Sequence, residues 1–189
     1  MSILQIGKLF VSPHEGWDQV ARIHPSVIKL FVLLIVPMSL VPPLMLEYAG
    51  RHYGSVLYPA ASARAWTIAA LFFLFAELLT VPLMAWGIKS VARSRGVMSN
   101  FHDAFTLAAI APIPLWLSSL ALFSSNIFLI VGIVAFGLVG SVLLIFRGVE
   151  GILGVEEDVV AFNLAYIVTA MGLIAWVLLV MLGLVPSIG

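Results

Sequence analysis

The chain contains 189 residues, of which 62% are hydrophobic and 10% are charged, with a formal net charge of zero and a mean hydropathy of +1.17. A soluble domain of this length carries about 25% charged residues, so the composition excludes a water-soluble fold and predicts an integral membrane protein. The charge balance excludes a nucleic-acid-binding surface, and the absence of cysteine excludes disulfides, thiolate metal sites and cysteine nucleophiles.

The segment before the first apolar stretch is predicted to remain in the mature chain, because it has neither the unbroken apolar run nor the cleavage site of a signal peptide. Within it, apolar and polar residues alternate over 13–24, and Pro13 suits the first turn of a helix. We therefore expect a short amphipathic helix that lies in the plane of the membrane. The alternative is a loosely ordered lead-in whose Trp17 belongs to an aromatic belt.

Apolar stretches of roughly 20 residues, the length that crosses ~30 Å of hydrocarbon as a helix, occur five times. They are continuous and lack the alternating polarity of β-barrel strands. The predicted fold class is therefore all-α: a single polytopic bundle of five transmembrane helices preceded by the short interfacial helix. The first stretch is the weakest, since it contains Lys29 and three prolines. The predicted spans are residues 27–47, 66–88, 103–123, 127–147 and 159–185.

The lysines and arginines predict the orientation, because cytoplasmic loops carry an excess of positive charge. Seven of the nine fall on the side that holds the N-terminus, and two fall on the other side. We therefore expect a cytoplasmic N-terminus and, after five crossings, an external C-terminus. The seven are Lys8, Arg22, Lys29, Lys89, Arg93, Arg95 and Arg147, and the two are Arg51 and Arg64.

Glu77 lies near the middle of the second span, where a carboxylate costs roughly 2.5–3.5 kcal/mol on insertion scales. Thr80 lies one turn away, and Pro82 lacks the N–H that would bond the Leu78 carbonyl. A kinked helix carrying a carboxyl group at its break would line a polar cavity, a proton relay or a cation path. The alternative is a neutral carboxyl group that donates a hydrogen bond to the backbone or a hydroxyl group of a neighbouring helix.

Pro112 and Pro114 break the third span, because they remove two helical donors and disfavour the α region at Ala111 and Ile113. Broken helices at membrane depth expose backbone groups that can bind a substrate. A proline-kinked helix that serves only packing is the alternative.

Small residues on the last two spans predict close helix packing or contacts with partner proteins. A Gly137→Leu change is therefore expected to weaken an oligomer without loss of the fold. The small-residue positions are Gly132, Gly137 and Ser141 on the fourth span and Ala161, Ala165 and Thr169 on the fifth.

Arg147 and Glu150 are spaced to form an ion pair across one helical turn. The acidic run 156–158 is expected to be solvated, and the four histidines show no paired spacing, so the sequence predicts no metal site and no cofactor. His102 is expected to start a helix beside Asp103. The chain also lacks a Gly-rich phosphate loop, paired helical histidines and a serine nucleophile flanked by glycines, so an enzyme is not expected.

Four short motifs occur in an order that resembles the Yip family of Rab/Ypt-interacting membrane proteins and their bacterial inner-membrane relatives. The resemblance implies five transmembrane helices with a cytosolic N-terminus. Only about 26 residues precede the first span, which makes the chain more similar to the compact bacterial branch, and the resemblance implies no reaction. The motifs are Leu9 to Pro13 with Trp17, His102 to Phe105, Ala111 to Leu117, and Leu143 to Val149.

Together these observations predict a non-enzymatic inner-membrane protein that interacts with membrane lipids or other membrane proteins and forms a homo-oligomer through its small-residue faces. The alternative is a small transporter or channel that uses Glu77 and the break at Pro112 and Pro114.

Overall fold

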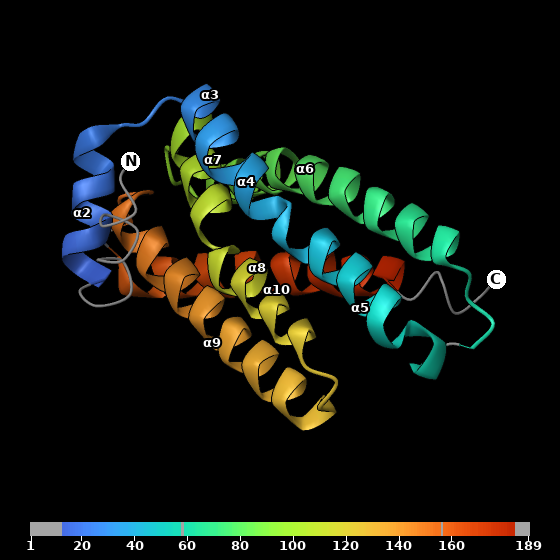
Figure 1. The fold of residues 1–189 in the computed structure, drawn as a ribbon. Coiled ribbons are helices and arrows are strands. Elements are labelled where there is room, and N and C mark those ends of the chain that lie inside the picture. The colour runs from blue at the N-terminus through green and yellow to red at the C-terminus, as the bar shows by residue number, and fades with distance from the viewer. Residues whose placement is uncertain (1–12, 58, 156, 184–189) are drawn as a thin grey trace.

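The computed structural model describes residues 13–57, 59–155 and 157–183, and every regular element in these ranges is helical. Within them, five helical stretches are long and apolar enough to cross a membrane (Figure 1). The predicted all-α bundle with five spans is therefore confirmed. The stretches are Val27–Ser55, Ala63–Ser94, Phe101–Phe123, Ile127–Gly151 and Asp158–Gly183.

The helices extend beyond most of the predicted apolar limits, because caps rather than hydropathy set their ends. The Ser62 side chain accepts from the Ala65 N–H at 3.2 Å and so starts the second span early. The Asn126 side chain likewise accepts from the N–H of Phe128 at 3.0 Å. Such side chains satisfy donors that a helix start leaves unpaired. Residues 184–185 of the predicted fifth span, Lys8, and residues 9–12 of the first motif lie outside the described residues.

The first span is divided, as its prolines predict. It consists of α3 (Val27–Leu30), a π-helical turn η1 (Phe31–Ile35), α4 (Val36–Ser39) and α5 (Val41–Leu57). Pro37 lacks an N–H for the regular ladder, and the π turn lies immediately before it. Pro42 and Pro43 fall in the first turn of α5, where a missing N–H costs nothing.

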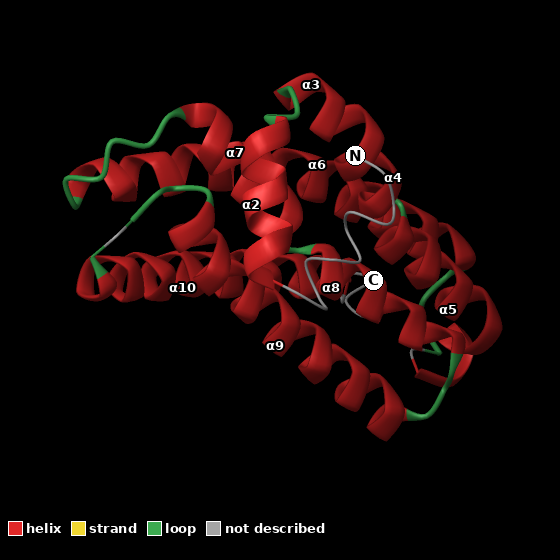
Figure 2. Cartoon of the chain, turned by 90° about the vertical axis from the view of Figure 1, so that its left-hand side faces the viewer, coloured by secondary structure: helices red, strands yellow, loops and turns green. Residues whose placement is uncertain are grey.

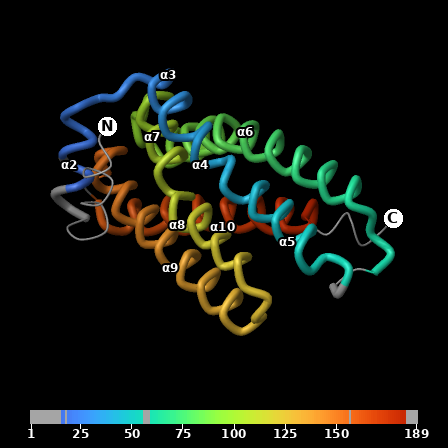
Figure 3. Tube along the Cα trace, viewed as in Figure 1, coloured from blue at the N-terminus to red at the C-terminus, as the bar shows by residue number. Residues whose placement is uncertain are grey.

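The broken third span lies in the interior of the bundle. It consists of α7 (Phe101–Ile110), α8 (Ile113–Ser118) and a 3₁₀ turn η2 (Ser119–Phe123), and Figure 3 shows the change in chain direction between α7 and α8. Its apolar window is 61% buried, against 17% for each of the last two spans. Irregular backbone is tolerated at membrane depth only where protein or a cavity covers it. The break therefore explains why this helix is central.

The remaining spans surround this broken helix. α6 (Ala63–Ser94) contacts α5, α7 and α10 (Asp158–Gly183), while α8 packs on α9 (Ile127–Gly151). α9 and α10 meet where Phe146 and Phe162 stack edge to face at 5.6 Å between ring centroids. From that end the two helices diverge (Figure 1).

Residues 13–24 do contain a helix, α2 (Pro13–Ile23), which lies across one end of α9 (Figure 2). Trp17 is 1% exposed and packs on Gly148 and Gly151. An added Cβ would lie 2.8 Å from the indole Cζ2 at Gly148 and 2.8 Å from the Trp17 Cβ at Gly151. An aromatic-belt role for Trp17 is therefore wrong, because the glycines of α9 leave room for its ring inside the protein. The position of α2 in the membrane plane stays a prediction.

Candidate functional site

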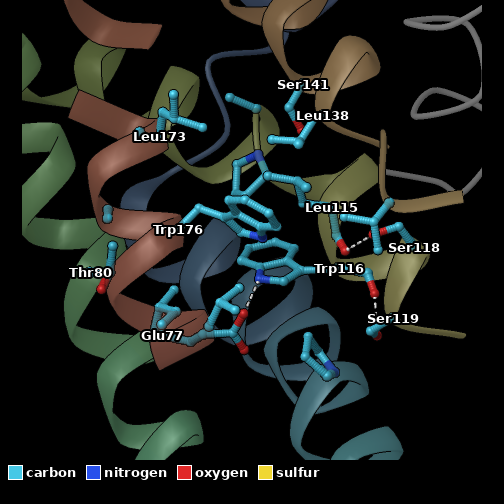
Figure 4. Close-up of a pocket in the computed structure, with 18 of the residues that line it drawn as sticks. Glu77, Thr80, Leu115, Trp116, Ser118, Ser119, Leu138, Ser141, Leu173 and Trp176 are labelled. Atoms are coloured by element: carbon cyan, nitrogen blue, oxygen red, sulfur yellow. Dashed lines mark hydrogen bonds between the residues drawn. The ribbon is translucent and has the colours of Figure 1, made fainter. Parts of the chain in front are cut away.

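A cavity of about 810 Å³ lies between α6, α8, α9 and α10, and Figure 4 shows residues that line it. Its walls are mostly apolar, and α9 and α10 supply much of them. Glu77, Thr80 and Ser118 are among the few polar residues that line it. Large apolar side chains in its walls include Leu138, Val142, Leu173, Trp176 and Leu179.

Glu77 joins two helices at this cavity. It projects from α6, is 4% exposed, and its Oε1 accepts a hydrogen bond of 2.8 Å from the indole Nε1 of Trp116 on α8 (Figure 4). Trp116 is equally buried. A buried polar group is costly unless it has a partner, and this bond supplies one for each residue. The bond differs from the expected one, in which Glu77 donates to the backbone or a hydroxyl of a neighbouring helix, because here Glu77 accepts from an indole N–H.

Three oxygen atoms around the cavity have no hydrogen-bond partner among the described residues. They are Oε2 of Glu77, Oγ of Ser141 on α9 and Oγ1 of Thr169 on α10, and all three atoms are buried. Buried polar atoms without a partner are rare and call for an explanation such as a bound water or ligand. These residues are therefore the places in the cavity wall where polar atoms are left without a partner among the described residues.

The other hydroxyl groups in the cavity wall are satisfied by their own helices. Thr80 donates to the Ala76 carbonyl at 2.6 Å, Ser118 to the Leu115 carbonyl at 2.7 Å, and Ser119 to the Trp116 carbonyl at 2.6 Å. These bonds fix the hydroxyl protons on backbone oxygens. Thr80, which the sequence places in one candidate polar site with Glu77, thus lines the cavity and bonds within its own helix.

The prolines occupy different places around the cavity. Pro82 lies inside α6, which continues to Ser94, and the cavity does not include it. Pro112 lines the cavity and caps α8. Pro114 packs against α9, where an added Cβ on Gly140 would lie 3.1 Å from its Cβ.

The predicted break after Ile110 is present, but the expected loss of α conformation at Ala111 is wrong. Ala111 has φ −54° and ψ −39°, and its N–H bonds the Leu107 carbonyl at 3.0 Å. A proline disfavours the α region in the preceding residue without forbidding it. The chain instead turns at Pro112, and the Trp116 N–H then bonds the Pro112 carbonyl at 3.0 Å to start α8.

The small residues of α9 differ in what they face. An added Cβ on Gly137 would lie 2.8 Å from the Ser118 Cβ and 2.9 Å from the Pro114 carbonyl, so this glycine lets α8 and α9 touch. Gly132 has no described atom near an added Cβ. On α10, Ala161 and Ala165 are buried. A Gly137→Leu change would therefore disrupt the packing of α8 on α9 within one chain. This differs from the expectation that the change weakens an oligomer without loss of the fold.

Arg147 and Glu150 lie near the end of α9, away from the cavity. Their side chains approach to 3.8 Å and both are about half exposed, so the pair contributes little to stability.

Trp116 is the residue that the sequence analysis missed. An indole carries one donor on a large apolar ring, and a buried tryptophan usually finds an acceptor. Trp116 follows the proline break in the span that the structure places in the interior. Its position beside this break was the signal in the sequence that could have suggested it as a partner of Glu77.

Four apolar spans around an interior broken span, with a buried Glu77–Trp116 pair between them, define an integral, multi-span membrane protein. The chain belongs to the Yip1 domain family, whose model matches residues 7–179. Searches of curated proteins and of solved structures gave no significant match.

Proposed function

We propose that this protein acts without catalysis by binding a membrane lipid, whose acyl chain occupies the cavity between α6, α8, α9 and α10. The observation that carries the proposal is the cavity itself. Its volume of about 810 Å³ falls in the range of ~300–1,000 Å³ typical of small-molecule sites. Its mostly apolar walls suit a hydrocarbon chain.

The position of the cavity supports a lipid as the occupant. α9 and α10 are the least buried spans, and both expose large apolar side chains such as Leu143 and Ile174. In a bilayer these helices face the acyl chains directly. The lipids that surround the protein are therefore the nearest supply of a ligand for the cavity. Apolar cavities do not hold water well, which favours hydrocarbon over a water column.

The unpaired oxygens of Glu77, Ser141 and Thr169 are the proposed contacts for a polar group of the lipid. The hydroxyls of Thr80, Ser118 and Ser119 donate to backbone carbonyls. A serine nucleophile needs an adjacent base to take its proton, and these serines direct their protons into the helix backbone. This arrangement supports a binding role in preference to an enzymatic one.

A transporter or channel is the second candidate, because Oε2 of Glu77 is buried, has no partner among the described residues, and belongs to a residue that lines the same cavity as Pro112. Buried acids in membrane spans often relay protons. Flux of protons or cations into liposomes that contain the purified protein, abolished by Glu77→Gln, would favour transport. Liposomes without flux would leave lipid binding as the better account.

Native mass spectrometry of the purified protein, released from lipid nanodiscs, tests the lipid proposal. We expect the wild-type chain to retain a lipid and a Ser141→Phe variant to lose it, because the added ring projects from the cavity wall. The matched control is Gly132→Phe on the same helix, where an added Cβ meets open space, and it should retain the lipid. A second filling variant, Leu173→Trp, tests the opposite wall if Ser141→Phe does not fold.

Equal lipid retention by wild type and both filling variants would contradict the proposal, as would a wild-type protein that retains none. A second copy of the chain is the alternative occupant and would fit the predicted homo-oligomer. It would appear as a dimer mass that Ser141→Phe dissociates, and that result would also overturn the lipid assignment.

We further propose a cytoplasmic N-terminus in a bacterial inner membrane. The described cations support the orientation: Arg22 and Lys29 precede or open the first span, while Lys89 and Arg93 end the second. Arg51 lies near the opposite end of the first span. The resemblance to bacterial Yip relatives supports the choice of membrane.

Because the chain has no cysteine, single cysteines test this orientation without background. Ala60, in the turn before α6, and Ser94, the last residue of α6, are both exposed. In intact cells, we expect a membrane-impermeant maleimide to label Ala60→Cys at once and Ser94→Cys only after the membrane is permeabilised. The reverse pattern would place the N-terminus outside.

A further inference from the structure

His24 meets two residues distant from it in the sequence, His102 and Asp103, at the start of α7. His24 lies in the linker between α2 and α3, and His102 and Asp103 lie in the first turn of α7. One ligand atom from each residue lies within 4.8 Å of the other two. The imidazole centroids of His24 and His102 are 5.5 Å apart.

The hydrogen bonds of His102 fix which of its nitrogens carries a proton. Nε2 lies 2.9 Å from the Pro25 carbonyl oxygen, which can only accept, so Nε2 carries a proton and donates it. In the neutral ring Nδ1 then presents a lone pair. Histidines that bind metals commonly hold their second N–H against a carbonyl in this way, which orients the ring.

The lone pair on Nδ1 faces another acceptor. Oδ1 of Asp103 lies 3.3 Å from Nδ1, and two lone pairs at this distance repel unless a cation lies between them. A second ring proton is one such cation, and a metal ion is the other. For bonds of about 2.0–2.1 Å, the ligands of a tetrahedral zinc ion are about 3.3–3.4 Å apart, which matches the separation of Nδ1 and Oδ1.

His24 is the third residue of the cluster. It is exposed and has a backbone φ of +41°, in a region that histidine enters more readily than most residues. Its ring can rotate toward the other two residues because it lies in a linker. His102 and Asp103 are 28% and 20% exposed, so an ion from the aqueous phase can reach the site.

We propose that His24, His102 and Asp103 form a binding site for a divalent transition metal ion, with zinc as the best match. Two imidazoles and one carboxylate suit zinc and its neighbours in the periodic table, and a water molecule would complete the tetrahedron. The bound ion would join the α2–α3 linker to α7. Since α2 packs on α9, the bound ion would also link α7 to α9 through the linker and α2.

Zinc titration of tag-free protein in nanodiscs, read by competition with a chromophoric chelator, tests the proposal. We expect one zinc per chain in the wild type. His24→Ala and Asp103→Asn should each weaken binding by at least about tenfold. Both variants should fold, because His24 is exposed and the helix cap at Asn100 uses the backbone N–H of Asp103.

The matched control is His52→Ala, which removes an exposed histidine at the other end of the first span and should leave zinc binding unchanged. Cobalt provides a second readout, since a tetrahedral site gives intense visible bands that His24→Ala should remove. No stoichiometric zinc binding at micromolar protein would overturn the proposal and indicate a protonated His102 paired with Asp103. Binding that survives both cluster variants would also overturn it. Neither result depends on lipid in the cavity.

Discussion

A Gly137→Leu variant is expected to lose the contact between α8 and α9 and to be much less stable than the wild type. Even the first side-chain atom would come within 2.8 Å of the Ser118 Cβ and 2.9 Å of the Pro114 carbonyl. The carbonyl is backbone and cannot rotate away. Overpacking of this kind typically costs about 1–3 kcal/mol or more, and leucine adds three carbons beyond the first clash.

Gly132→Leu is the matched control for this prediction. It places the same side chain on the same helix, at a position with open space around an added Cβ, and removes the same unfavourable helical glycine. Thermal unfolding in nanodiscs should show a large decrease in Tm for Gly137→Leu and little change for Gly132→Leu. Similar decreases would mean that α8 and α9 are not packed through Gly137.

These two glycines also show how far the sequence could predict the packing. The sequence identifies small residues on an apolar helix, which predicts close approach, but it does not say which neighbour approaches. Gly137 and Gly132 look alike in the sequence, and only the turn at Pro112 that brings α8 onto α9 separates them. The spans themselves were predictable because hydropathy is a local property of each segment.

The candidate site shows the same division. Glu77 was identifiable because an acid in an apolar span is expensive, and the break at Pro112 was identifiable because proline acts locally. The partner Trp116 depends on a contact between two spans, and the cluster of His24 with His102 depends on the path of the linker after α2. Pairs that form only through tertiary structure have no regular spacing in the chain.

The second large effect is expected from the Glu77–Trp116 pair. Trp116→Phe keeps most of the ring and removes the donor, leaving both oxygens of Glu77 without a partner among the described residues. An unsatisfied buried polar group costs about 1–3 kcal/mol. Glu77→Leu should cost a similar amount, because it leaves the indole N–H unpaired. Glu77→Gln keeps an acceptor and should be the mildest of the three.

A double-mutant cycle separates the bond from the packing. If the two side chains stabilise each other, Trp116→Phe combined with Glu77→Leu should be less destabilised than the sum of the single variants, since no orphaned polar atom remains. Hydrogen bonds in membranes are often weaker than expected, so we anticipate a coupling of about 1 kcal/mol. The measurement is the free energy of unfolding in mixed micelles.

Additive effects in this cycle would contradict the pairing.

The same variants also distinguish a structural role of Glu77 from a role in lipid binding. Glu77→Leu removes the unpaired Oε2 that we assign to a lipid contact, whereas Trp116→Phe removes only the donor to Oε1. If the cavity binds a lipid through Glu77, Glu77→Leu should retain less lipid than Trp116→Phe at equal stability. A purely structural carboxyl group would give equal retention, because each variant places an apolar side chain at the altered position of the cavity wall.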